Sequence, residues 1–159
     1  MESWYGFFQA TAGASATLIG MLVVAISINL SRILSIAHLP GRAAGALVPL
    51  AGALIVSILA FVPGQPTVAF GVEAGLTGAV IWVMTGRTLL RSRSQTGAPR
   101  GWLWSHLLLS QAQSLPFIVA GAMLILGHSG GLYWTVPGLA FAILGGILNT
   151  WVLLVEILR

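Results

Sequence analysis

The stretch that decides the fold is AAGALVPLAGALIVSILAFV, residues 43–62, which carries no charged side chain. It is as long as the roughly 20 residues that a helix needs to cross the hydrocarbon core of a bilayer. Strands of a membrane barrel would alternate apolar and polar residues over about ten positions. This run has Ser57 as its one polar side chain and shows no alternation, so it predicts a transmembrane helix.

The whole chain has the same character as this stretch. Its 159 residues are 57% hydrophobic and 6% charged, with a mean hydropathy of +0.97. Because soluble domains carry about 25% charged residues, this chain cannot cover a surface that faces water. The pI of 11.3 reflects a small excess of arginine and does not indicate nucleic-acid binding. We therefore expect an integral membrane protein with no soluble catalytic domain and no nucleic-acid partner.

Four polar breaks divide the chain. They are HLPG at 38–41, PGQP at 63–66, RSRSQTGAPR at 91–100 and HSGG at 128–131, all rich in the turn formers Gly and Pro. The first apolar run has no positive residue before it and is longer than a signal core, so it is interpreted as a retained span. The prediction is a five-transmembrane-helix bundle, all-α, in one domain over 1–159, with spans at about 4–36, 42–62, 67–90, 101–127 and 132–158.

The arginines give this bundle an orientation. With five spans, all of them fall on one side of the membrane: Arg32, Arg42, Arg87, Arg91, Arg93, Arg100 and Arg159. Four or six spans would divide them between the two sides. Because positive residues concentrate in cytoplasmic loops, we expect the N-terminus outside and the C-terminus in the cytoplasm.

Small residues form stripes at helical spacing in three spans. In membranes such stripes let two backbones approach closely. The third span contains Gly71 and Gly75 four residues apart, and the fifth carries Gly138, Ala142, Gly145 and Asn149. The stripe of the first span is a candidate pore lining or packing seam, and it includes Gly13, Thr17, Gly20 and Ser27.

A second group of candidates consists of polar side chains within the spans. Glu73 lies six residues into the third span, where a carboxylate should face the protein interior or find a partner. Thr77 shares its face, and Gln9, which reaches a similar depth on the first span, could be the partner of Glu73. Gln111 and Asn149 also reach similar depths, so they could meet. The candidate intramembrane polar or ion site is Glu73, Thr77, Gln9, Gln111, Gln113 and Asn149. The alternatives are packing between helices, a hydrated cavity, and an ion or proton site.

The serine and histidine residues of this chain do not come together as the catalytic residues of hydrolases do. Ser15 lies in the outer half of the first span, His38 and His106 belong to the inner side, and His128 lies beyond the outer end. Ser15 therefore has no histidine base within reach. The chain lacks Cys, Lys and Asp, and also the Gly-x-Ser-x-Gly and His-Glu-x-x-His motifs. We predict no enzyme, no cofactor and no metal site.

The run FFQATAGASATLIGMLVVAISINL, residues 7–30, is followed by LPGR at 39–42. It resembles an uncharacterised family of short bacterial multi-span membrane proteins, mainly over the first two spans. The resemblance implies a multi-pass protein of the bacterial cytoplasmic membrane, and it carries over neither a function nor site residues.

Two functions remain open. The polar stripes favour a homo-oligomeric channel or small-solute and ion pore. The short loops and glycine-rich faces favour the alternative, a regulatory or scaffolding subunit that binds lipid or another membrane protein, for example a membrane protease or transporter. Both interpretations expect membrane lipids as partners, and the glycine-rich faces in addition predict self-association.

Overall fold

The computed structural model describes the backbone of residues 2–36, 39–96 and 100–158, and the side chains of 3–36, 39–88, 90 and 107–155. Within these ranges every regular element is a helix. They are η1 (Glu2–Trp4), α1 (Tyr5–Ile28), α2 (Leu30–Ser35), α3 (Leu39–Leu59), α4 (Thr67–Thr96), α5 (Arg100–Ile125) and α6 (Gly131–Leu158). All but η1 and α2 are long and apolar enough to cross a membrane, which confirms the predicted five-helix bundle.

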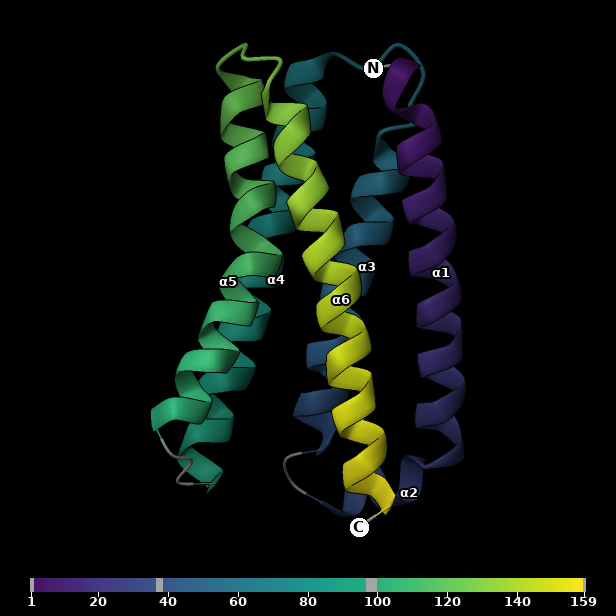
Figure 1. Cartoon of the computed structure of the whole chain (residues 1–159), viewed down its shortest axis with the longest axis vertical. Coiled ribbons are helices and arrows are strands. Elements are labelled where there is room, and N and C mark those ends of the chain that lie inside the picture. Colours follow the sequence, from purple (N-terminus) through teal and green to yellow (C-terminus); the bar gives the residue numbers. More distant parts are fainter. Residues whose placement is uncertain (1, 37–38, 97–99, 159) are drawn as a thin grey trace.

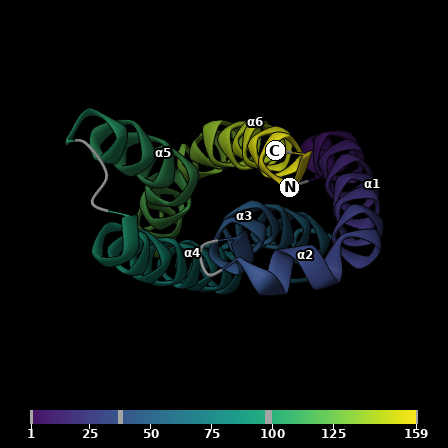
Figure 2. The ribbon, with the colours of Figure 1, turned by 90° about the horizontal axis from the view of Figure 1, so that it is seen from below.

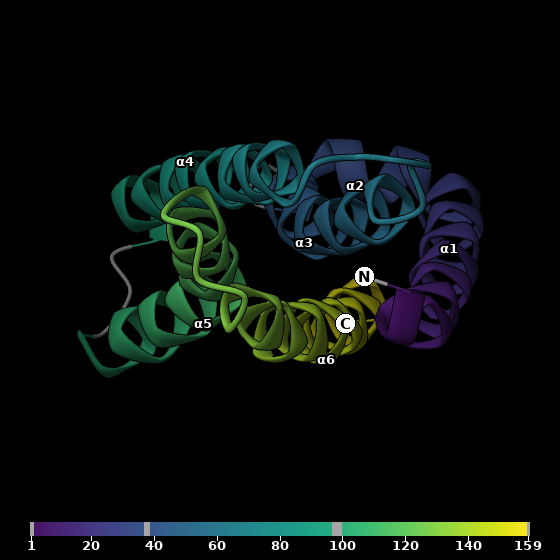
Figure 3. The ribbon, with the colours of Figure 1, turned by 90° about the horizontal axis from the view of Figure 1, so that it is seen from above.

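The helices α3, α4, α5 and α6 run antiparallel in turn and form a ring in which each packs on the next and α6 returns to α3. Views along the long axis show this ring, with α1 standing outside it at one edge (Figures 2 and 3). α1 packs mainly on α3, through Phe8, Ser15 and Leu22. The short helix α2 lies at one end of the bundle (Figure 1), which we call the α2 end.

The first predicted span is broken where the sequence predicted a continuous helix over 4–36. α1 ends at Asn29, whose backbone leaves the helical region with φ −108° and ψ 17°. The Asn29 side chain donates to the backbone oxygen of Ala25 at 2.9 Å. Asparagine competes with the backbone for hydrogen bonds in this way, and that competition favours a helix end. The six residues of α2 then pack against α3 instead of extending α1.

The two turns at the other end of the bundle depend on glycine. Gly64 and Gly127 have φ of 68° and 80°, a left-handed conformation that other residues rarely adopt. At the end of α5, the N–H of His128 donates to Met123 O at 2.9 Å and that of Gly127 to Leu124 O at 3.1 Å. This pair of bonds is a Schellman motif, which ends the helix and satisfies its last carbonyls.

The buried side chains form two clusters along the bundle. The cluster nearer the N-terminus includes Phe8, Phe70 and Phe117, from α1, α4 and α5. The cluster at the α2 end draws on α1, α2, α3 and α6 and, among the described residues, contains none from α4 or α5. Figure 1 shows the reason, since α4 and α5 lean away from α3 and α6 towards the α2 end.

Candidate functional site

Glu73 is half-buried in α4, and its partner comes from the turn between α3 and α4. The amide Nε2 of Gln65 donates to Glu73 Oε2 at 2.6 Å. Thr77, one turn further along, donates its hydroxyl to the backbone oxygen of Glu73 at 2.8 Å. We predicted that Gln9 would be the partner of Glu73, and this was wrong. Gln9 is exposed on α1, which packs mainly against α3, so matching depth did not bring it to Glu73.

The polar residues of α5 pair with α4 on one side and meet α6 on the other. Trp82 Nε1 in α4 donates to Gln111 Oε1 at 3.1 Å. Half a helical turn away, Gln113 is 2% exposed, and its Nε2 has no hydrogen-bond partner among the described residues. A Cβ placed on Gly145 of α6 would overlap this amide nitrogen. The Gln113 amide therefore fills the space that the absent side chain of Gly145 leaves.

Asn149 does not meet Gln111 as the depth argument predicted. Its Nδ2 donates instead to the backbone oxygen of Gly45 in α3 at 3.3 Å. Two further hydroxyl pairs join helices: Thr85 of α4 lies 2.8 Å from Ser110 of α5, and Thr11 of α1 lies 2.9 Å from Ser57 of α3. Interhelical hydrogen bonds of this kind hold membrane helices together, each contributing about 0.6–2 kcal/mol.

The six residues of the candidate polar site are therefore spread over several places. Glu73 and Thr77 lie together at the start of α4, Gln111 at the α4–α5 contact, Gln113 at α5–α6, Asn149 at α3–α6, and Gln9 on the surface. Among the residues that the structure describes, no three His, Cys, Asp or Glu side chains gather as metal ligands would. Gln111 and Asn149 each hydrogen-bond to another helix, Gln113 packs against α6, and the six side chains do not converge on one point.

The glycines of α4 are used within the chain. A Cβ on Gly121 of α5 would lie 2.6 Å from Gly71 O and 2.7 Å from Gly75 Cα. Gly78 packs against Phe117 in the same contact. Gly71 and Gly75 form a close helix contact, as their spacing predicted, but the helix that they approach is α5 of the same chain and not a second copy. The stripe of α6 is likewise a packing face, with Gly138 against Phe117 and Ala142 fully buried.

The small-residue stripe of α1 is exposed, in contrast to the stripes of α4 and α6, which are packed against other helices. The seam residues Gly13, Thr17, Gly20 and Ser27 are all exposed, on the side of α1 that faces away from α3. A Cβ on Gly13 or Gly20 would meet nothing within 4 Å. The hydroxyls of Thr17 and Ser27 donate to the backbone oxygens of Gly13 and Val23, at 2.8 and 2.7 Å. We call these four residues, with the exposed Ala10 and Val24, the outer face of α1.

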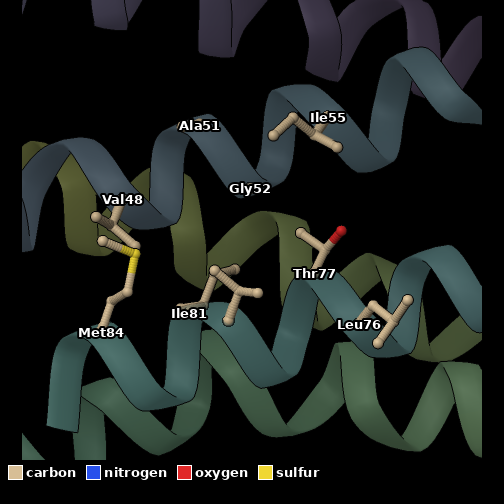
Figure 4. Close-up of a pocket in the computed structure, with 9 residues that line it drawn as sticks. Val48, Ala51, Gly52, Ile55, Leu76, Thr77, Ile81 and Met84 are labelled. Carbon is tan, nitrogen blue, oxygen red and sulfur yellow. The ribbon is translucent and has the colours of Figure 1, made fainter.

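An open apolar groove lies between α3 and α4 (Figure 4). Its volume is about 340 Å³, and it is lined by Val48, Ala51, Gly52, Ile55, Leu76, Thr77, Val80, Ile81 and Met84. Gly52 and Ile81 are buried at its floor, where a Cβ on Gly52 would overlap the Ile81 side chain. The sequence pattern does not indicate this groove, because the groove depends on how two helices diverge. The only sequence signal for Gln65 is a polar side chain in the PGQP turn, beside a span that contains Glu73.

Comparisons with protein-family models, curated proteins and solved structures found no match to this chain.

Proposed function

We propose that this multi-pass membrane protein is a non-catalytic subunit that works by assembling with further copies of itself through the outer face of α1. The observation that carries the proposal is the position of that face. Its small side chains leave the backbone accessible, as is typical of a face that contacts another helix, yet the face points away from the rest of the chain. In α4 and α5 the same chain uses comparable glycines to bring two backbones into contact.

The polar side chains inside the bundle support an assembly role over transport through a single chain. Glu73, Gln111 and Asn149 each have a partner on another helix or turn, so their hydrogen-bonding groups serve packing. On the outer face, Thr17 and Ser27 are bonded to their own helix, which leaves no unsatisfied hydroxyl donor to disturb a dry contact. A second copy of α1 meets there a surface that is small in its side chains and satisfied in its hydrogen bonds.

The experiment is to enlarge one side chain on this face and measure the oligomeric state. Gly20→Ile places a branched side chain where nothing lies within 4 Å, so the fold of a single chain should survive. Ala140→Ile is the matched control, an exposed small residue on α6. We expect wild type and Ala140→Ile to share one oligomeric mass in mild detergent and Gly20→Ile to be monomeric. Equal masses for all three proteins would contradict the proposal.

A second candidate function, a pore at the axis of the oligomer, is favoured by the exposed hydroxyls of Thr17 and Ser27. If they line the axis, the oligomer in liposomes conducts a small ion, and Thr17→Val lowers the flux without changing the mass. An intact oligomer that leaves the liposomes impermeable would exclude the pore and retain the assembly.

For either function, we propose that the protein resides in the bacterial cytoplasmic membrane.

A further inference from the structure

The groove between α3 and α4 has the form of a site for a single hydrocarbon chain. Its floor is buried and apolar, whereas its rim is open, since Ile55, Leu76 and Val80 are all exposed. Figure 4 shows the side chains of Ile81 and Met84 directed from α4 towards α3. The one side-chain hydroxyl in the lining, that of Thr77, already donates to the backbone of Glu73, so the side chains of the groove offer no free donor to a polar ligand.

A positive charge stands at one end of this groove. Val80, Met84 and Arg87 follow one another at spacings of four and three, which places them on one face of α4. Arg87 is exposed, and no hydrogen bond or ion pair joins it to the described residues. Its guanidinium, which no described residue engages, lies where the apolar lining ends, on the side of the bundle that carries α2.

The distance from the far end of the groove to Arg87 matches one leaflet of a bilayer. From Leu76 to Arg87 along α4 is roughly 16 Å at 1.5 Å per residue. Half of a hydrocarbon core about 30 Å thick is roughly the same distance. A lipid whose headgroup lies at the level of Arg87 has an acyl chain long enough to follow the groove to Leu76.

We propose that the α3–α4 groove binds one anionic phospholipid from the leaflet at the α2 end, with an acyl chain in the groove and its phosphate on Arg87. The shape selects a chain, and the charge selects the headgroup. Arginine binds phosphate oxygens with two parallel hydrogen bonds, and a basic residue near a membrane surface favours anionic lipids. The divergence of α4 from α3 towards the α2 end keeps the groove open.

The test uses the full chain in mild detergent, with phosphatidylglycerol and phosphatidylcholine of identical acyl chains as probes. Native mass spectrometry gives the dissociation constant of the first lipid bound. For wild type we expect phosphatidylglycerol to bind about fivefold more tightly than phosphatidylcholine, the effect of one favourable basic contact. Equal binding of the two lipids would overturn the proposal.

Two variants with matched controls separate the headgroup from the chain. Arg87→Gln should remove the preference for phosphatidylglycerol, whereas Arg32→Gln, an exposed arginine in α2, should keep it. Val80→Trp fills the groove from its rim and should weaken the first binding of both lipids about tenfold, the loss of about two buried methylene groups. Val72→Trp, on the same helix outside the groove, should bind as wild type does. The proposal is refuted if either variant behaves like its control.

Discussion

Two helices approach each other closely at Gly121, and this contact makes a quantitative prediction. A Cβ at Gly121 would lie 2.6 Å from Gly71 O and 2.8 Å from Gly75 N, both backbone atoms that no rotamer change can move aside. An ordinary contact needs at least 3.4 Å, so α4 and α5 must separate by about 0.8 Å at this point. Gly121→Ala therefore strains the contact that joins these two helices.

The expected cost follows from two opposing effects. Overpacking a close contact costs about 1–3 kcal/mol, and alanine regains up to about 1 kcal/mol of helix propensity over glycine. The net loss for Gly121→Ala is about 1–2 kcal/mol. Gly75→Ala is the matched control from the opposite side of the same contact, because its Cβ would meet Gly121 Cα at an ordinary 3.6 Å. We expect Gly75→Ala to be as stable as wild type or slightly more stable.

Thermal unfolding in one detergent, followed by tryptophan fluorescence, measures both variants. For a chain of this size, 1 kcal/mol corresponds to a change in Tm of about 2–4 °C. We expect Gly121→Ala to melt below wild type by at least this amount, and Gly75→Ala not to melt below it. Equal melting temperatures for the two variants would refute the interpretation of the α4–α5 contact.

Three further predictions follow from the packing and the charge pattern. A reporter fused after Arg159 should be active only in the cytoplasm, because five spans put all the arginines of the sequence on one side of the membrane; activity outside would reverse the proposed orientation. Gln65→Ala removes the donor to Glu73 and should lower the free energy of unfolding by about 1 kcal/mol, measured as a lower Tm. Glu73→Gln keeps an acceptor oxygen and should melt close to wild type, so equal losses of Tm for the two variants would count against this hydrogen bond. Gly145→Ala should lower the Tm, and Gln113→Ala in the same chain should recover most of that loss, since the two residues compete for one space; additive losses would show that they do not.

The sequence predicted the elements of this fold because the signals are local. Apolar runs of span length fixed the five long helices, and Gly-Pro turns fixed most of their ends. Where a local signal was overlooked, the prediction was wrong. Asn29 is a poor residue for a helix interior, and the single span predicted across it is two helices.

The contacts between helices were harder to predict, since depth along an axis does not give rotation about it. Gln9 and Glu73 lie at similar depths, but Gln9 points outwards and Gln65 takes its place. Small-residue stripes show that a backbone can be approached without naming the helix that approaches it. The stripe of Gly71 and Gly75 meets α5 within the chain, and that of α1 meets nothing in it.

The measurement that tests assembly through α1 most directly is disulfide formation between two chains. The chain contains no cysteine, so a disulfide formed by a single introduced cysteine can only join the same position in two chains. A disulfide forms when the two Cα atoms approach to about 4.4–6.8 Å. We predict that Gly13→Cys, Thr17→Cys or Gly20→Cys gives a covalent dimer on oxidation in the membrane, whereas Ala122→Cys and Ala140→Cys, exposed on α5 and α6, stay monomeric. Monomers from all three α1 positions, or equal dimer from the controls, would contradict the account.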